Sequence, residues 1–309
     1  KQAASSDAAY RTVVDELQAR HHQLIADVVP GNRQAKLTEQ IDALFEEMRS
    51  ILHGVFLIQD LTPKTSDAIV AYGERLSSLI CAALINGARH YDSRTFIKTT
   101  LQGTKRLVDF DTTNRLIRET FAERCPVAVM GGFIATDVNS GRTTNLGRGG
   151  SGYTAPLTSD PGGPTYPASI IAAALHADAL EIWTDVDGFL TAAPRLIPEA
   201  YTIPQLSYGE ATELCNFGAK VIYPPTIYPV CTENIPIYVK NTFNPSAAGS
   251  VIRREACSSQ RPIRGISSVN EMSMVTVSGM SMVGVIGVNR RIFTTLAAGG
   301  ISVFMVAQT

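Results

Sequence analysis

The chain has 309 residues and carries 27 Lys and Arg against 28 Asp and Glu, which gives a formal charge of −1. Near neutrality gives no support to a nucleic-acid or polyanion-binding surface. The apolar runs are short or broken by polar residues, so no membrane span is predicted. This length accommodates one large α/β domain and a smaller module.

The N-terminal region is predicted to be helical. Residues 7–28 and 34–52 carry apolar side chains at helical spacing, and Pro30-Gly31-Asn32 separates them as a turn. They are expected to form a helical hairpin with charged outer faces.

A third helix is predicted to begin at a cap formed by Ser66 and Asp67 and to run to about Asn86. Glu74 and Arg75 lie inside it, early enough to face a cleft.

The middle of the chain alternates between predicted strands and helices. The strands are 126–130, 179–183 and 235–239, and the helices are 168–177, with Pro167 in its first turn, and 207–217. This alternation predicts an α/β fold with a mainly parallel sheet and helices on both faces. Ligands then gather beyond the C-terminal ends of the strands, where Asp185 and Asp187 follow the second of them.

The C-terminal region follows two predicted loops, 244–249 and 258–262. It is expected to form a strand at 272–277, a helix at 289–296 and a strand at 300–306. Such a βαβ unit leaves a sheet edge that something else must cover.

The cysteines show no pairing pattern. An odd number, five, without a Cys-x-x-Cys spacing argues against a disulfide framework and a zinc site. Buried free thiols are expected, and no metal-binding residue is assigned.

Three segments carry the strongest functional signal: Asn145-Leu-Gly-Arg-Gly-Gly-Ser151, Trp183-Thr-Asp-Val-Asp-Gly188 and Phe217-Gly-Ala-Lys-Val221. The glycines around one arginine let backbone N–H groups approach an anion. The second segment is a strand that ends in polar ligands, and the third brings a mobile lysine. Together they predict a site for a polyphosphate and an acidic substrate.

In this order and at these spacings the segments resemble the aspartate kinases of the amino-acid kinase family. Gly73-Glu-Arg-Leu-Ser-Ser78 resembles the family's substrate segment, and the chain from Pro262 onward resembles the start of an ACT regulatory domain. The resemblance implies an amino-acid-kinase-like catalytic domain over 1–257, lacking the family's first strand and its Lys-Phe-Gly-Gly-Thr motif. A truncated ACT-like βαβ module would follow over 262–309.

The resemblance implies ATP-dependent phosphorylation of the L-aspartate side chain to 4-phospho-L-aspartate. This is the first step towards lysine, threonine and methionine. ATP and Mg²⁺ are the implied cofactors. Homo-oligomers formed through ACT domains and feedback by threonine or lysine are also implied. So is a cytoplasmic location, or a plastid one if the source is a plant. No nucleic-acid or membrane partner is expected.

Roles for the substrate residues follow. A guanidinium matches a carboxylate bidentately, so Arg148 is expected to grip the substrate α-carboxylate, supported by Gly149, Gly150 and Ser151. The family match favours Glu74 as the ligand of the substrate ammonium group and allows Phe133 to pack on the substrate. An exposed helix glutamate and a core phenylalanine are the alternatives.

Roles for the nucleotide residues also follow from the resemblance. Thr184 and Asp185 would hold the base and ribose, and Arg195 and Lys220 the phosphates. Lys220 and Arg148 are the catalytic candidates. Without the resemblance, Thr184 and Asp185 read as a strand-end turn and Lys220 as a solvated lysine.

The sequence departs from the family pattern in four places. The opening lysine motif is not present and Lys1 is not an initiator methionine, so the chain is expected to be incomplete at its N-terminus. Gly152 and Ala193 stand where the family has aspartates, and residues 156–167 are an insertion. Asp160 can substitute in principle, although a surface turn is the favoured interpretation.

These departures predict substrate binding with weak or absent turnover. The alternatives are a catalytically silent binding or regulatory chain with the same fold, and another amino-acid kinase, such as one for glutamate or acetylglutamate. The ACT-like tail and the Gly-Glu-Arg-Leu-Ser segment favour aspartate over these substrates.

Overall fold

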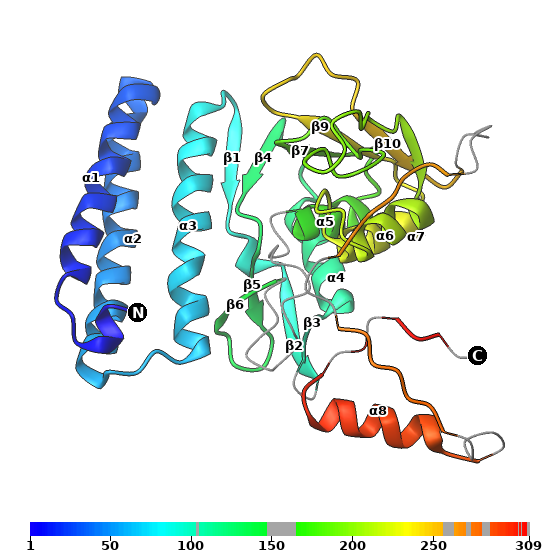
Figure 1. Ribbon diagram of the computed structural model, residues 1–309. Coiled ribbons are helices and arrows are strands. Elements are labelled where there is room, and N and C mark those ends of the chain that lie inside the picture. The colour runs from blue at the N-terminus through cyan, green and yellow to red at the C-terminus, as the bar shows by residue number, and fades with distance from the viewer. Residues whose placement is uncertain are drawn as a thin grey trace. The chain divides into compact units, whose positions relative to one another are not determined.

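The computed structural model describes residues 1–102, 105–146, 165–255, 263–269, 273–279, 285–301, 303 and 305–307 (Figure 1). The chain divides into two compact units. Unit 1 comprises Lys1–Gly150, Gly162–Ile182 and Tyr223–Tyr238, and unit 2 comprises Ser151–Pro161, Trp183–Ile222 and Val239–Thr309.

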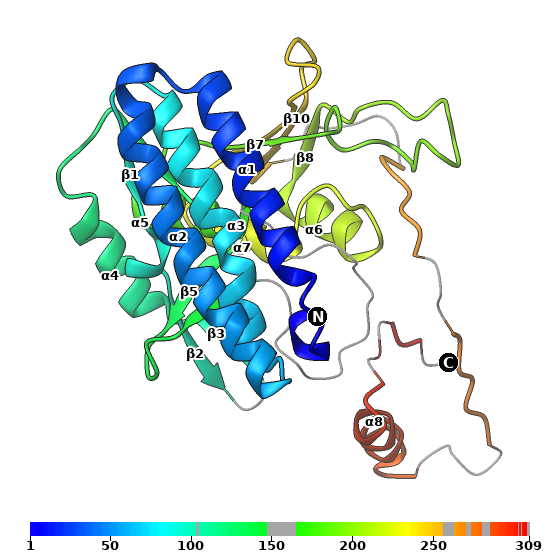
Figure 2. The ribbon, with the colours of Figure 1, turned by 90° about the vertical axis from the view of Figure 1, so that its left-hand side faces the viewer.

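Unit 1 begins with a short 3-10 turn, η1 (Ala3–Ser5), and a layer of three helices: α1 (Tyr10–Val28), α2 (Gly31–Ile58) and α3 (Pro63–Leu84). Figure 2 shows the three helices side by side, and α2 packs against both α1 and α3. Apolar side chains at helical spacing close the layer around the fully buried Ile41 and Phe45. The predicted helical hairpin is confirmed.

The third helix begins earlier than predicted. Its N-cap is Thr62, whose hydroxyl accepts the N–H of Thr65 at 3.2 Å, and Pro63 occupies the first helical position. A cap hydroxyl followed by proline suits a helix start, because proline has no N–H that needs a partner there. The predicted cap at Ser66 and Asp67 is therefore wrong, and Asp67 lies inside the helix.

The strands of unit 1 form two sheets. The first pairs β1 (Ala88–Tyr91) with β4 (Val127–Met130) in parallel, which confirms the predicted strand at 126–130. The second has the order β3-β2-β5-β6, made of β2 (Lys98–Gln102), β3 (Lys105–Val108), β5 (Ile134–Asp137) and β6 (Thr143–Asn145). In it β2 and β5 are parallel, whereas the β2–β3 and β5–β6 pairs are antiparallel.

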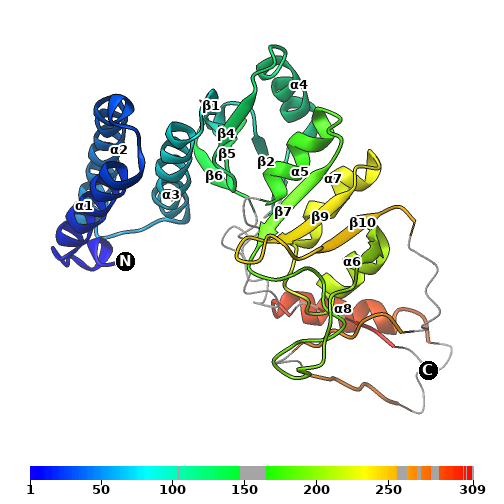
Figure 3. The same cartoon turned by 90° about the horizontal axis from the view of Figure 1, so that it is seen from above.

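Strand β5 shows how the second sheet is covered on both faces. Ile134 packs with Ala71 of α3 and with Phe133, whereas the next residue, Ala135, belongs to the core shared with Ile117 and Ile170. Alternate residues of a strand point to opposite faces. Figure 3 accordingly shows α4 (Phe110–Thr120) and α5 (Thr165–Ala174) on the side of these strands opposite α3. The predicted helix at 168–177 is α5, shifted towards the N-terminus.

A third sheet has the order β7-β9-β10-β8. Its strands are β7 (Leu180–Thr184), β8 (Gln205–Ser207), β9 (Ile237–Asn241) and β10 (Ser250–Arg253), and β8 and β10 are parallel. The remaining elements along this part of the chain are η2 (Ser93–Thr95), α6 (Tyr208–Asn216), η3 (Pro224–Thr226) and α7 (Ile227–Thr232). Helix α6 starts at a capping box in which Ser207 and Glu210 satisfy each other's backbone N–H groups.

The α/β class with parallel strand pairing and helices on both faces is confirmed, and within the described residues the strands divide among three sheets. The C-terminal region differs more from its predicted strand, helix and strand. Helix α8 (Val288–Ala298) matches the predicted helix. The described residues 273–279, 300, 301, 303 and 305–307 form no strand. A strand exists only where a neighbour satisfies its backbone groups, and alternating apolar residues do not supply that neighbour.

Candidate functional site

Glu74 lies at the middle of α3 and is half-buried. Burial raises the pKa of its carboxyl above the usual range, although the backbone N–H of Gly132 donates to the carboxylate and acts in the opposite direction. A half-buried carboxylate that accepts one N–H still has lone pairs for a cationic group. Glu74 is thus an oriented acceptor rather than a freely solvated helix glutamate.

The close approach of the chain to Glu74 favours glycine at position 131. A Cβ at Gly131 would lie 3.1 Å from the Cβ and from the carbonyl oxygen of Glu74, closer than ordinary packing allows. Gly132 then reaches the carboxylate, and Phe133 follows with a φ of +64°. A positive φ is costly for a bulky residue and persists only when its surroundings fix it.

Phe133 is buried and is held from both sides. Its ring packs with Ala71 of α3 and with Ile134, and its carbonyl accepts the N–H of Leu146 at 2.7 Å. Two predicted substrate residues, Glu74 and Phe133, are therefore brought together by the turn Gly131-Gly132-Phe133 between β4 and β5.

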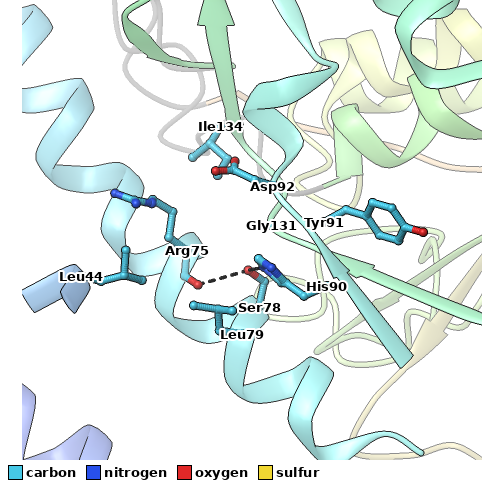
Figure 4. Close-up of a pocket in the computed structure, with 9 residues that line it drawn as sticks. All are labelled: Leu44, Arg75, Ser78, Leu79, His90, Tyr91, Asp92, Gly131 and Ile134. Atoms are coloured by element: carbon cyan, nitrogen blue, oxygen red, sulfur yellow. Dashed lines mark hydrogen bonds between the residues drawn. The ribbon is translucent and has the colours of Figure 1, made fainter. Parts of the chain in front are cut away.

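A cavity of about 90 Å³ lies beside this turn in unit 1 (Figure 4). Gly131 lines it together with Leu44, Arg75, Ser78, Leu79, His90, Tyr91, Asp92 and Ile134. Its volume admits several water molecules. Next to it, the buried Ser93 hydroxyl donates to the Gly131 carbonyl and so fixes the turn from the side of η2.

The polar groups around the cavity are partnered. Arg75 pairs with Glu47 at 3.0 Å and stacks over the Tyr72 ring, and the Ser78 hydroxyl lies 3.0 Å from Nε2 of His90. Burial lowers the pKa of His90, which favours its neutral form. The side chains of Arg75, Ser78 and His90, which line the cavity beside the turn, therefore already have partners within unit 1.

The loop predicted to bind the substrate carboxylate and phosphates lies outside the described residues. This applies to Arg148, Gly149, Gly150 and Ser151, and also to Gly152 and Asp160. The described chain reaches Leu146, which the bond to Phe133 holds beside the substrate turn.

In unit 2, Thr184 and Asp185 stand where β7 ends. The Thr184 hydroxyl donates to the Asp185 carboxylate at 3.1 Å, and the Thr184 carbonyl accepts the N–H of Thr242 at 2.8 Å. Asp185 is exposed, whereas Asp187 accepts the side-chain amides of Asn241 and Asn244. Of the two aspartates, Asp185 has the more accessible carboxylate.

A buried hydroxyl fixes the turn that follows. Ser250 accepts the N–H of Phe189 at 2.9 Å and donates to the Ile203 carbonyl at 2.6 Å. Gly188 has a φ of +117°, and a Cβ there would overlap Ser250. The turn after Asp187 therefore requires glycine.

Arg195 and Lys220 are both exposed and belong to unit 2. Lys220 follows Gly218, which has a φ of +119° and approaches the Ser268 carbonyl so closely that a Cβ would overlap it. This glycine sets the direction in which the chain leaves α6 towards Lys220.

The sequence did not predict the contacts of three residues that organise these turns: Asn145, which opens the loop motif, Ser93 and Ser250. Asn145 binds Asp67 of α3, and the two serines anchor Gly131 and Phe189. No local pattern identifies them, because each partner lies 38 to 78 positions away in the sequence, with Ser250 and Phe189 61 apart. Only Thr62-Pro63 carried a readable local signal, that of a helix start.

Among the described residues, no group of three or more His, Cys, Asp or Glu is placed to hold a metal ion. The four described cysteines are free, and only Cys215 is buried, which raises the pKa of its thiol to about 11. Cys81 is exposed, and Cys125 and Cys231 are half-buried, so the expectation of buried thiols is wrong for these three. Among the described helices, none is long and apolar enough to cross a membrane.

Comparison with known proteins identifies the family of this chain. The model of the amino acid kinase family matches residues 4–241. The chain belongs to the amino acid kinase family.

Among curated proteins, the chain is similar to the bifunctional aspartokinase/homoserine dehydrogenase of Haemophilus influenzae, with 35% identity over 274 residues. It is also similar to aspartokinase 2, chloroplastic, of Arabidopsis thaliana, with 31% identity over 280 residues. These matches cover 87% and 88% of this chain, but 32% of the first relative and 49% of the second. The chain thus spans a third to a half of the length of these relatives.

Among solved structures, the chain resembles aspartokinase III of E. coli in complex with aspartate and ADP. The TM-score is 0.70 at 27% identity, covering 88% of this chain and 58% of the other. The lysine and aspartate complex of E. coli aspartokinase III gives a TM-score of 0.69 at 24% identity over 96% of this chain and 63% of the other, which supports the fold.

Proposed function

We propose that this chain carries the catalytic unit of an aspartokinase, which transfers the γ-phosphoryl group of ATP to the side-chain carboxylate of L-aspartate. The observation that carries the proposal is the Glu74-Gly132-Phe133 arrangement within a fold whose relatives are named aspartokinases. The E. coli neighbour was solved with aspartate and ADP, the substrate and product nucleotide that this reaction requires.

The amino-acid substrate is assigned to Glu74, Phe133 and the loop from Arg148 to Ser151. Glu74 accepts the substrate ammonium group on the lone pairs that Gly132 leaves open, and Phe133 forms the apolar wall beside it. Arg148 grips the α-carboxylate, and the backbone of Gly149, Gly150 and Ser151 approaches the phosphates. This division holds the two charged ends of an amino acid and leaves its side-chain carboxylate to react.

The nucleotide half is assigned to unit 2. Thr184 and Asp185 bind the base and ribose, and Arg195 and Lys220 meet the phosphates. The aspartate carboxylate is already ionised at neutral pH and needs no general base. The protein's work is to bring two anions together, and the charges of Arg148 and Lys220 offset their repulsion.

Mg²⁺ fits this site as an ion held mainly by phosphate oxygens and water. Such ions seldom use a dedicated protein cage, which agrees with the single accessible carboxylate, Asp185, at the end of β7. When bound with ATP, Mg²⁺ neutralises phosphate charge.

Aspartate-dependent release of ADP tests the proposal. The unmodified chain is assayed with ATP and Mg²⁺, with and without L-aspartate, and with glutamate and acetylglutamate as competing acceptors. Formation of an acid-labile acyl phosphate with aspartate alone supports the proposal. Preference for another acceptor assigns the chain to a different amino-acid kinase.

A second candidate is a catalytically silent chain that binds the same ligands. Gly152 and Ala193, which stand where the resemblance places aspartates, favour it. Here calorimetry detects aspartate and ADP binding while ADP release stays at background. Electrostatic groups of this kind contribute roughly 10²–10³ in rate, so Gly152→Asp would then raise turnover measurably. Robust turnover by the unmodified chain rejects the silent candidate.

The remaining assignments extend the same proposal. Residues 262–309 would begin an ACT-like module that mediates homo-oligomers and feedback by threonine or lysine, after a catalytic domain over 1–257. The cytoplasm is the proposed location, or the plastid if the source is a plant, since several relatives are chloroplastic.

A further inference from the structure

We infer that Asn145 is a positioning residue that ties β6 to α3 and thereby holds Phe133 against Glu74. The inference rests on the proposed function for the role of Glu74 and Phe133. The link itself is a feature of unit 1 that involves no ligand.

The contact joins two elements distant in the sequence. The side-chain amide nitrogen of Asn145 donates to the main-chain carbonyl of Asp67 at 3.1 Å and to its carboxylate at 3.3 Å. Both partners are acceptors, so the amide must present its N–H₂ group to Asp67. Asp67 lies seven residues before Glu74, which places both near one face of α3.

The strand register places Asn145 where it can act on Phe133. Asn145 pairs with Ile134 across the β5–β6 ladder, and both lie on the sheet face that α3 covers. The next residue, Leu146, donates its N–H to the Phe133 carbonyl at 2.7 Å. Asn145 thus connects the strand that restrains Phe133 directly to the helix that carries Glu74.

The side-chain amide of Asn145 is only partly satisfied. Asn145 is 7% exposed, and within the described residues its side-chain oxygen is buried without a hydrogen-bond partner. A buried acceptor left unsatisfied costs free energy, and leucine has nearly the same shape without that cost, although it leaves the acceptors of Asp67 without their donor. What leucine cannot do is donate to Asp67.

The carboxyl of Asp67, which accepts from Asn145, is also affected by burial and by a neighbouring charge. Burial raises the pKa of its carboxyl, while the charge of Arg106 and the Asn145 hydrogen bond act in the opposite direction. Arg106 of β3 also pairs with Asp137 of β5 at 3.2 Å. Asp67 therefore interacts both with Asn145 of β6 and with the charge of Arg106, which belongs to the same sheet.

The test compares Asn145→Leu with Thr144→Val in the full chain. Thr144 is the matched control, because it is buried on the same strand and points to the opposite face, where its hydroxyl lies 2.9 Å from that of Thr99. Three quantities are measured: amide hydrogen exchange at Leu146 without ligand, thermal stability, and calorimetric affinity for aspartate and ADP. Asn145→Ser, whose hydroxyl is too short to reach Asp67, serves as a second variant if the leucine variant does not fold.

We expect Asn145→Leu to speed Leu146 exchange and to weaken aspartate binding, each by at least tenfold. The melting temperature should fall as well, because Asp67 loses this donor. ADP affinity should change less than twofold, and Thr144→Val should leave Leu146 exchange and aspartate affinity within threefold of the unmodified chain. A purely structural role would weaken the binding of both ligands together.

Equal Leu146 exchange in the Asn145 variants and the unmodified chain overturns the inference, and so does an equal effect of Thr144→Val. If the unmodified chain binds no aspartate while Leu146 exchange responds to Asn145 alone, the proposed function fails. The link between β6 and α3 then stands by itself.

Discussion

The candidate residues of the two units are held differently. In unit 1, Glu74 and Phe133 are buried or half-buried, and a glycine turn, a strand ladder and a helix fix their positions. In unit 2, Asp185, Arg195 and Lys220 are exposed, and the structure fixes chiefly the backbone that leads to them. In unit 1 the structure fixes the positions of the candidate side chains, whereas in unit 2 it fixes mainly the turns beside them.

This difference fits the two proposed ligands. A small amino acid offers few atoms, so its recognition depends on buried charges whose energies are large and sensitive to geometry. A nucleotide offers phosphates and a sugar that backbone groups and long flexible cations can reach. Substitutions should therefore act sharply and selectively in unit 1, and through turn geometry in unit 2.

The largest expected effect comes from Glu74→Gln. Removing the charge opposite the substrate ammonium should weaken aspartate binding roughly 30- to 1000-fold, the range for losing one partner of a desolvated charge pair. ADP affinity should not change. Calorimetry with each ligand measures both, and Glu46→Gln, the same change at an exposed site on α2, is the control. Unchanged aspartate affinity would remove Glu74 from the substrate half.

Gly218→Ala tests the turn-based half. The positive φ and the approach to the Ser268 carbonyl leave no room for a Cβ, so we expect a loss of roughly 1–3 kcal/mol in stability. ADP affinity should fall with it, because Lys220 is redirected. Gly209→Ala in α6 is the control, since its Cβ would meet only Ser207 at 3.9 Å. A stable Gly218→Ala chain with normal ADP affinity would contradict the assignment.

Aspartate binding should depend on pH through Glu74. The ionised form binds ammonium, so affinity is present above the Glu74 pKa and falls as the pH drops through it, by about tenfold per pH unit. Because burial raises that pKa, the loss begins at a higher pH than for an ordinary glutamate. Glu74→Gln should bind weakly with little pH dependence over that window.

The raised pKa of Glu74 predicts the opposite pH trend for the stability of the fold. A carboxyl whose pKa is higher in the folded chain favours folding below its unfolded pKa, and this contribution is lost as the pH rises through the folded value. Glu74→Gln should therefore leave the melting temperature unchanged or higher at neutral pH. A lower melting temperature would show that the Glu74 charge supports the fold rather than the ligand.

The smallest effect concerns the helix that carries Glu74. Thr62→Ala removes the N-cap of α3 and should cost about 1 kcal/mol of stability, seen as a lower melting temperature. Thr62→Ser keeps the hydroxyl and should retain most of it. Aspartate affinity should change little, because the cap lies three turns from Glu74. Equal loss in both variants would mean that packing of the Thr62 methyl group, not capping, stabilises this end.

Much of the fold follows from local sequence. Helical spacing predicted α1, α2 and α8, and short apolar runs predicted β4, β7 and β9 to within a few residues. The candidate substrate and nucleotide residues came from family motifs, and the structure brings Glu74 and Phe133 together. The roles of these residues remain predictions, and those of Arg148 to Ser151 concern residues outside the described part of the chain.

By itself, the sequence determined most of the helical segments, α4 and α7 excepted. It also determined where glycines permit tight turns and to which family the chain belongs, because these properties depend on neighbouring residues. Tertiary structure decided the rest. The Asn145–Asp67 bond and the positive φ of Phe133 arise where distant segments meet. The segment around 273–279 shows the converse, since its alternating pattern forms no strand without a neighbour. A hydrogen bond needs two partners, and a local pattern specifies only one of them.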